Sequence, residues 1–142
     1  MAGYLLDTNH LSEAIRPVSR VRDRIEQERR SGLRIGTCVP ALCELQAAIQ
    51  PLARRDRYEK ALGRLLSRLR VWPIDQTIAR NYGQIFTELR NRGRVLSQVD
   101  MILAALARQM DLTVVTSDRD FDALPDIRKE NWLAQRLGFL GS

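Results

Sequence analysis

The chain has 142 residues, 44% of them hydrophobic, and this length suits one domain with a single core. Its 23 lysine and arginine residues outnumber its 17 acidic residues, giving a formal net charge of +6. Such a charge favours a polyanionic partner, most simply a nucleic acid, although a modest positive charge also serves solubility alone. The single histidine, His10, excludes a multi-histidine zinc site and argues against a Ser-His-Asp triad.

Neither a signal peptide nor a membrane span is predicted. Met1 is followed directly by a short apolar segment, and no apolar stretch approaches the roughly 18 residues that suggest a membrane helix. Cys38 and Cys43 form neither a disulfide framework nor a CxxC pair, and both are interpreted as reduced core thiols. We therefore expect a soluble, cytoplasmic protein that does not bind membranes.

Strands and helices are predicted to alternate along the chain. Short apolar runs predict strands at residues 4–6, 33–39, 71–74 and 112–116, with a fifth around Ile127. Periodicity and cap signals predict helices from about Leu11 to Pro17 and over 19–30, 41–52, 53–70, 77–92, 97–110 and 131–137. Ser19 and Thr77 are the expected N-caps of two of these helices, and Pro40 fits the first turn of another.

This alternation predicts an α/β fold with a mostly parallel sheet and helices on both of its faces. In open sheets of this kind, the reactive crevice lies beyond the carboxyl ends of the strands. Asp7 and Asp118 both follow predicted strands. The basic side of helix 53–70 is most simply a solvated face.

Four acidic residues lie far apart in the chain, each where an apolar run ends or a helix face begins: Asp7, Glu44, Asp100 and Asp118. If the fold gathers them, their mutual repulsion at low dielectric requires a bound cation. Carboxylate ligands without a Cys or His set match Mg²⁺ or Mn²⁺. Such an ion activates water and neutralises a phosphodiester's developing charge, so the pattern predicts metal-dependent phosphodiester hydrolysis.

Each acid also has a simpler local explanation. Asp7 suits an Asx-turn or a helix cap, and Asp100 stands three residues after Ser97, as in a variant capping box. Glu44 is expected at the buried edge of an apolar helix stripe, where it needs a partner or a metal. Asp118 could serve a loop turn, although the strand period places the Thr116 hydroxyl on the same side as its carboxylate.

Taken together in chain order, these residues resemble a PIN-domain ribonuclease of the VapC toxin type. The matching segments, which span nearly the whole chain, are Tyr4-Leu5-Leu6-Asp7-Thr8-Asn9, Glu44-Leu45, Gly93 through Asp100-Met101-Ile102-Leu103-Ala104-Ala105, Val114-Val115-Thr116-Ser117-Asp118 with Asp120-Phe121, and Asn131-Trp132. No single segment is diagnostic, whereas the ordered set is specific. The resemblance implies one PIN domain over residues 1–142, with a twisted, mostly parallel sheet of four or five strands in a three-layer α/β/α arrangement.

The resemblance also implies the roles of the acidic residues. Asp7 and Asp100 would be the most direct ligands of Mg²⁺ or Mn²⁺, with Glu44 and Asp118 completing the site directly or through water. Thr116 would orient a ligand or a water molecule. Ser117 replaces an asparagine common in the family, and with further acids nearby the fourth acid stays open between Asp118 and Asp122.

In function, the resemblance implies a toxin that cuts tRNA or another structured RNA, with a metal-activated water as the nucleophile. Family members usually form homodimers and are neutralised by a VapB antitoxin whose tail fills the active-site groove. Two alternatives stay open. One is a catalytically inactive PIN fold that binds RNA or protein, and the other is a phospho-acceptor receiver domain, which requires a paired acid after the first strand and a lysine after a late one.

Overall fold

The structure is a computed structural model that describes residues 2–133. Within them, the strands form one five-stranded sheet in the order β3-β2-β1-β4-β5, and every neighbouring pair is parallel. The strands are β1 (Gly3–Leu6), β2 (Arg34–Cys38), β3 (Arg70–Trp72), β4 (Thr113–Val115) and β5 (Lys129–Glu130). The predicted parallel sheet is confirmed, and its pairing is parallel throughout.

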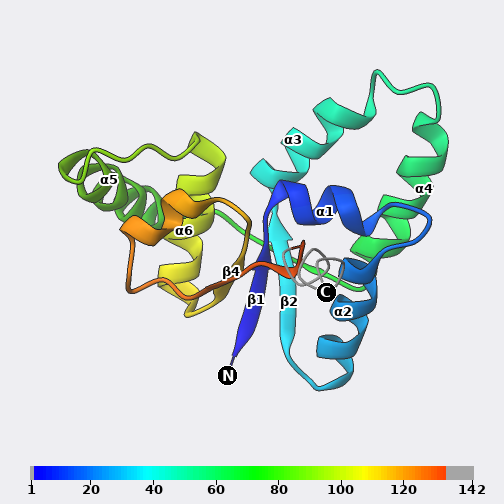
Figure 1. Cartoon of the computed structure of the whole chain (residues 1–142), viewed down its shortest axis with the longest axis horizontal. Coiled ribbons are helices and arrows are strands. Elements are labelled where there is room, and N and C mark those ends of the chain that lie inside the picture. Colours follow the sequence, from blue (N-terminus) through cyan, green and yellow to red (C-terminus); the bar gives the residue numbers. More distant parts are fainter. Residues whose placement is uncertain (1, 134–142) are drawn as a thin grey trace, which may run out of the picture.

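Helices cover both faces of this sheet. They are α1 (Thr8–Ala14), α2 (Arg20–Arg30), α3 (Val39–Ile49), α4 (Arg55–Leu66), α5 (Gln76–Asn91) and α6 (Gln98–Met110), followed by the 3₁₀ helix η1 (Arg119–Ala123). Figure 1 shows α5 and α6 on one side of the strands, and α1, α2 and α4 on the other. The three-layer α/β/α arrangement is therefore confirmed.

Local capping chemistry explains most helix starts. The Ser19 hydroxyl accepts from the Arg22 N–H at 3.0 Å, as predicted. The N-cap of α5, however, is Asp75 and not Thr77, since the Asp75 carboxylate accepts from the N–H of Ile78. Helix α1 begins at Thr8, earlier than expected, because Asp7 caps it.

The last predicted strand is present in the structure, slightly later in the chain than expected. Strand β5 lies at 129–130, just after Ile127, where it pairs with Val114 and Val115 of β4. Short strands carry little periodicity, so their position depends on pairing that the local sequence does not encode. The predicted helix over 131–137 falls largely outside the described residues.

Strand β1 is the centre of the sheet and its topological switch point. From β1 the chain proceeds to β2 and β3 on one side, whereas β4 and β5 lie on the other. Leu6 pairs with Val115, and the N–H of Asp7 donates to the Val115 carbonyl at 3.1 Å. The carboxyl ends of β1 and β4 therefore meet where ligands bind in open α/β sheets.

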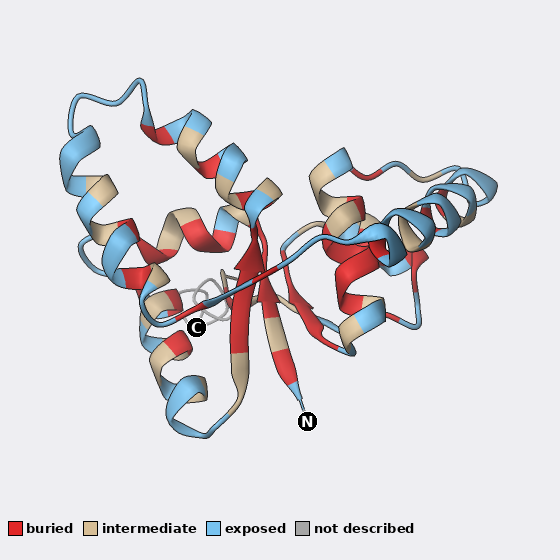
Figure 2. Ribbon diagram, turned by 180° about the vertical axis from the view of Figure 1, so that it is seen from behind, coloured by how far each residue is buried: buried red, intermediate tan, exposed pale blue. Residues whose placement is uncertain are grey.

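The core lies between the strands and the inward faces of the helices. Figure 2 shows buried residues along the strands and on the helix sides that face them. Leu5, Leu6 and Val114 are fully buried, and burying each such side chain stabilises the fold by roughly 1.5–3 kcal/mol. Both cysteines are free; Cys38 is buried, but Cys43 is exposed, so the prediction of two core thiols is wrong for Cys43.

Candidate active site

Asp7 lies directly after β1 and is almost fully buried. One carboxylate oxygen, Oδ1, accepts from the backbone N–H of His10 at 2.9 Å and lies 2.8 Å from Nδ1 of the same residue. Asp7 therefore does cap α1, as the local explanation predicts. Capping uses Oδ1 and does not exclude a ligand on the other oxygen.

Glu44 lies in the second turn of α3. The helix buries Ala41, Leu45 and Ile49, and Glu44 is exposed, so the expected buried-edge position is wrong. Its place just before Leu45 turns it about 100° away from the buried stripe. It is nevertheless held in place, because Thr8 Oγ1 donates to Glu44 Oε1 at 2.6 Å.

The pKa of the Asp100 carboxyl is affected by the charges of the other three acids. Asp100 lies in the first turn of α6, where its N–H donates to Ser97 Oγ at 3.1 Å. Burial, followed by the negative charges of Asp7, Asp118 and Glu44, raises the pKa of the Asp100 carboxyl to about 6, against a smaller lowering by the Ser97 hydrogen bond. The four predicted acids therefore share one electrostatic site.

Asp118 is half-buried after β4. Its N–H donates to Thr116 Oγ1 at 3.1 Å, and its carboxylate accepts from the Asp120 N–H at 2.9 Å. Thr116 thus holds the backbone of Asp118. Asp122, the alternative fourth acid, is exposed and forms an ion pair with Lys129 that lowers the pKa of its carboxyl.

The four clustered acids are not neutralised by the abundant arginines. Among residues 2–133, no ion pair joins an arginine or lysine to Asp7, Glu44, Asp100 or Asp118. By contrast, arginines pair with many other acids, such as Glu26, Glu88 and Asp126. The site therefore keeps an uncompensated negative charge inside a basic protein.

This donor set fits a hydrated divalent cation. Within the described residues, no three carboxylate, imidazole or thiol groups stand close enough together to enclose a metal ion. Mg²⁺ needs no such enclosure, because it retains several waters and is usually held by one or two carboxylates. Of the four acids, Asp7 is buried, Asp100 and Asp118 are half-buried, and Glu44 is exposed.

Comparison with known protein families matches residues 4–127 to the PIN domain. The chain belongs to this family. The predicted resemblance is thereby confirmed over most of the chain, and it agrees with the five-stranded parallel sheet.

Relatives of this PIN domain have similar lengths. Ribonuclease VapC2 of Rickettsia felis is 28% identical over 132 residues, which cover 91% of this chain and 97% of the relative. A tRNA(fMet)-specific endonuclease VapC of Shigella flexneri is 29% identical, covering 93% and 99% respectively. The crystal structure of VapBC2 from R. felis, bound to a DNA fragment from its promoter, contains a chain with a TM-score of 0.83 and 26% identity, covering 93% of this chain and 99% of that one.

His10 is the site residue that sequence reasoning missed. It is fully buried and contacts Asp7 on one side and Trp132 on the other. A single histidine indicates only that a multi-histidine zinc site is absent, and its position three residues after Asp7 carries no signal beyond helical spacing. Its contact with Trp132 spans 122 positions, which no local pattern encodes.

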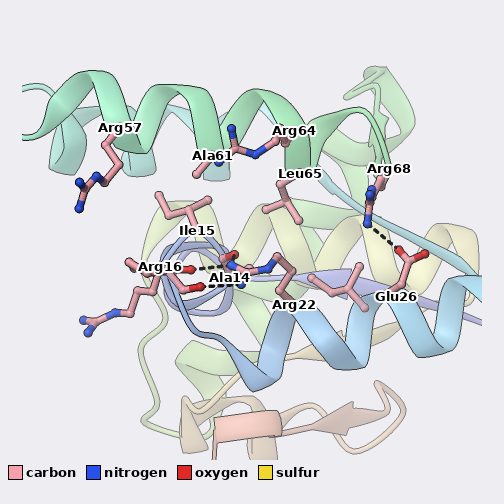
Figure 3. Close-up of a pocket in the computed structure, with 12 residues that line it drawn as sticks. Ala14, Ile15, Arg16, Arg22, Glu26, Arg57, Ala61, Arg64, Leu65 and Arg68 are labelled. Atoms are coloured by element: carbon pink, nitrogen blue, oxygen red, sulfur yellow. Dashed lines mark hydrogen bonds and ion pairs between the residues drawn. The ribbon is translucent and has the colours of Figure 1, made fainter.

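A second feature of this PIN domain is a groove of about 490 Å³ between α4 and the α1–α2 segment. Figure 3 shows Ala61 and Leu65 of α4 on one side of it and Ile15 on the other. Arginines surround this apolar floor: Arg16, Arg22, Arg57, Arg64 and Arg68. Arg22 binds the carbonyls of Ala14, Arg16 and Pro17 and so fixes the end of α1, whereas Arg68 pairs with Glu26 at 3.1 Å.

Proposed function

We propose that this chain is a Mg²⁺- or Mn²⁺-dependent endoribonuclease and the toxin of a VapBC-type toxin–antitoxin pair. The observation that carries the metal dependence is the gathering of Asp7, Glu44 and Asp118 around Asp100, and the raised pKa of the Asp100 carboxyl is consistent with it. Four acids at the switch point of a parallel sheet, with no cationic partner among the described residues, form a site for a divalent ion. The likeness to VapC ribonucleases supports RNA as the substrate.

The proposed roles follow from position. Asp7 and Asp100 hold the metal, while Glu44 and Asp118 align its water shell. Thr116 fixes the loop that carries Asp118. When bound, the ion supplies Lewis-acid polarisation of the scissile phosphate and lowers the pKa of an attacking water.

The basic charge supports binding of a polyanion. The chain carries a net +6, almost entirely from arginine, whose guanidinium group binds phosphate in a bidentate manner. Close to the acids, Arg94 pairs with Asp120 in η1, which begins directly after Asp118. We place the RNA backbone along such arginines, so binding should weaken steeply with salt. Structured RNA such as tRNA is the proposed substrate, in keeping with the relative from S. flexneri.

The groove between α4 and the α1–α2 segment supports the proposed antitoxin partner. Its apolar floor suits the apolar face of a short segment, and its arginine rim suits acidic residues beside that face. Arg57 and Arg64 form no ion pair within the described part of the chain, which leaves them available to such a segment. The partner is therefore an antitoxin with an acidic, amphipathic region.

We propose that the protein acts in the cytoplasm, where its RNA substrate is found. No helix in residues 2–133 is long and apolar enough to cross a membrane. Action in the cytoplasm follows from the proposed RNA substrate. The homodimer that the resemblance implies stays a prediction.

Cleavage of purified structured RNAs tests the function. Wild-type protein should cleave with Mg²⁺ or Mn²⁺, and EDTA, Asp7→Asn and Asp100→Asn should each abolish cleavage. Asp118→Asn should also be inactive, whereas Asp122→Asn, in the 3₁₀ helix that Asp118 caps but paired with Lys129, should keep near wild-type activity. Cleavage that persists with EDTA and both active-site variants would overturn the metal mechanism.

The alternatives predict different results. An inactive binding module would bind RNA without metal-dependent cleavage. A receiver domain needs a late-strand lysine beside its acids, but Lys129 pairs with Asp122, outside the four-acid cluster. No specific observation favours either alternative.

A further inference from the structure

Asp7 presents its two carboxylate oxygens to different partners. Oδ1 accepts the His10 backbone N–H at 2.9 Å and also lies 2.8 Å from His10 Nδ1. Two donors use both lone pairs of Oδ1. Oδ2 has no hydrogen-bond partner among residues 2–133, so it is the oxygen left for a ligand.

The opposite edge of the His10 ring is also occupied. Nε2 lies 3.3 Å from the backbone N–H of Trp132, which can only donate. Nε2 must therefore accept, and the ring proton must sit on Nδ1, where it faces Asp7. The two contacts together select the neutral Nδ1–H tautomer of a ring that is fully buried.

Trp132 is itself firmly placed. Its indole N–H donates to Glu130 Oε1 at 3.0 Å, and its ring packs edge-on against Tyr4 with centroids 5.2 Å apart. The guanidinium of Arg24 lies 4.8 Å from the centre of the same ring, within cation–π range. The backbone N–H that meets His10 is thus fixed from several sides.

We propose that His10 is a positioning residue that orients Asp7 for metal binding, with Trp132 fixing its tautomer. The inference rests on the proposed metal-dependent function. Through Nδ1–H and its own N–H, His10 holds Oδ1, which leaves Oδ2 as the oxygen for the metal. Hydrogen bonds of this kind to a ligating carboxylate usually change metal affinity by about 10–100-fold.

The tautomer is tested first in the wild-type protein. Because the chain has one histidine, ¹⁵N-labelled protein gives a single pair of ring-nitrogen signals in long-range ¹H–¹⁵N spectra. The expected result at neutral pH is a protonated Nδ1 and an unprotonated Nε2. A signal pattern with the proton on Nε2 would overturn the proposal without any variant.

Metal affinity is tested next, by Mn²⁺ titration followed by electron paramagnetic resonance. His10→Leu, which fills the space but removes both ring contacts, should weaken Mn²⁺ binding by about 10–100-fold. His10→Asn, whose amide N–H reaches the Nδ1 position, should recover affinity to within a few-fold of wild type. Leu89→Ala in the buried face of α5 controls for general destabilisation and should keep wild-type affinity despite a lower Tm.

The outcomes separate the two proposals. If wild-type protein binds no Mn²⁺, or Asp7→Asn binds it unchanged, the proposed function fails. If wild type binds Mn²⁺ and His10→Leu binds it equally well, only the positioning role fails. The role is also overturned if Leu89→Ala weakens Mn²⁺ binding as much as His10→Leu does. If His10→Leu does not fold, the ring tautomer of the wild-type protein and the Mn²⁺ affinity of His10→Asn still test the positioning role.

Discussion

Thr8 Oγ1 donates a 2.6 Å hydrogen bond to Glu44 Oε1 and so joins the start of α1 to α3 across 36 positions. This bond restrains an exposed carboxylate that would otherwise move freely. We expect Thr8→Val to lower single-turnover RNA cleavage about 10-fold, because the support of a site carboxylate is lost. Thr8→Ser should restore cleavage.

Thr87→Val provides the matched control for this prediction. Thr87 makes a comparable hydroxyl bond, to the Gly83 carbonyl, but on the exposed side of α5. It should leave cleavage unchanged. Equal losses in Thr8→Val and Thr87→Val would show that Glu44 gains nothing from Thr8.

Asp100→Asn should separate stability from activity. Burial and neighbouring carboxylates disfavour the ionised form, which raises the pKa of Asp100 to about 6. Removing the charge should therefore stabilise the metal-free protein at pH 7.5 by ~1–2 kcal/mol. This value takes ~1.4 kcal/mol for each unit by which the pKa is raised and reduces the total because Asp100 is partly exposed to solvent. Urea denaturation with EDTA measures this, and cleavage assays should show no activity. A less stable variant would contradict the electrostatic account.

The same pKa predicts how stability depends on pH without metal. The native state binds the Asp100 proton more tightly than the unfolded state, whose carboxyl titrates near the ordinary value of 3.8. The contribution of Asp100 to stability therefore falls as pH rises from about 4 to about 6, and stays low above that window. Mn²⁺ should stabilise the protein more at pH 7.5 than at pH 5.5, because it competes with the proton. Thermal unfolding at both pH values, with Asp100→Asn as the insensitive control, checks this.

Charge reversal on the groove rim should affect antitoxin binding but not RNA cleavage. Arg57 and Arg64 are exposed on α4 beside the apolar floor of the groove. The double variant Arg57→Glu/Arg64→Glu should slow association with the cognate antitoxin and reduce the salt dependence of that rate. Arg80→Glu/Arg90→Glu, on exposed positions of α5, is the matched control. Equal effects of the two pairs would place the partner elsewhere.

The sequence predicts the architecture well because strand and helix periodicities are local. Ser19 and Ser97 mark helix starts correctly, since a cap acts within three residues. Strand β5 is expected around Ile127 and lies just after it, because pairing with β4 fixes its position. The α5 cap at Asp75 is missed, because competition between nearby cap residues decides it.

The candidate site is predicted in composition but not in detail. All four acids share one electrostatic site, yet Glu44 is exposed where burial was expected. The preference for Asp118 over Asp122 depends on Lys129, which lies near Asp122 only through the pairing of β5 with β4. The link from Asp7 through His10 to Trp132 likewise depends on chain ends that meet only in the folded protein.

Gly36→Ala should destabilise the sheet beneath the site. A Cβ at Gly36 would overlap the carbonyl oxygen of Arg70 on the paired strand β3 and would lie 2.7 Å from Cζ3 of Trp72. Backbone cannot yield as a flexible side chain does, so the loss should be about 1–3 kcal/mol or more. Because Thr37 Oγ1 donates to the Leu6 carbonyl at 3.0 Å, just before Asp7, a shift of β2 should also lower cleavage.

Gly63→Ala in α4 is the control, because a Cβ there meets nothing within 4 Å. This variant should be neutral or stabilise the protein by up to about 1 kcal/mol. Urea unfolding of both variants decides, and equal stabilities would show that β3 does not approach β2 as closely as the structure has it.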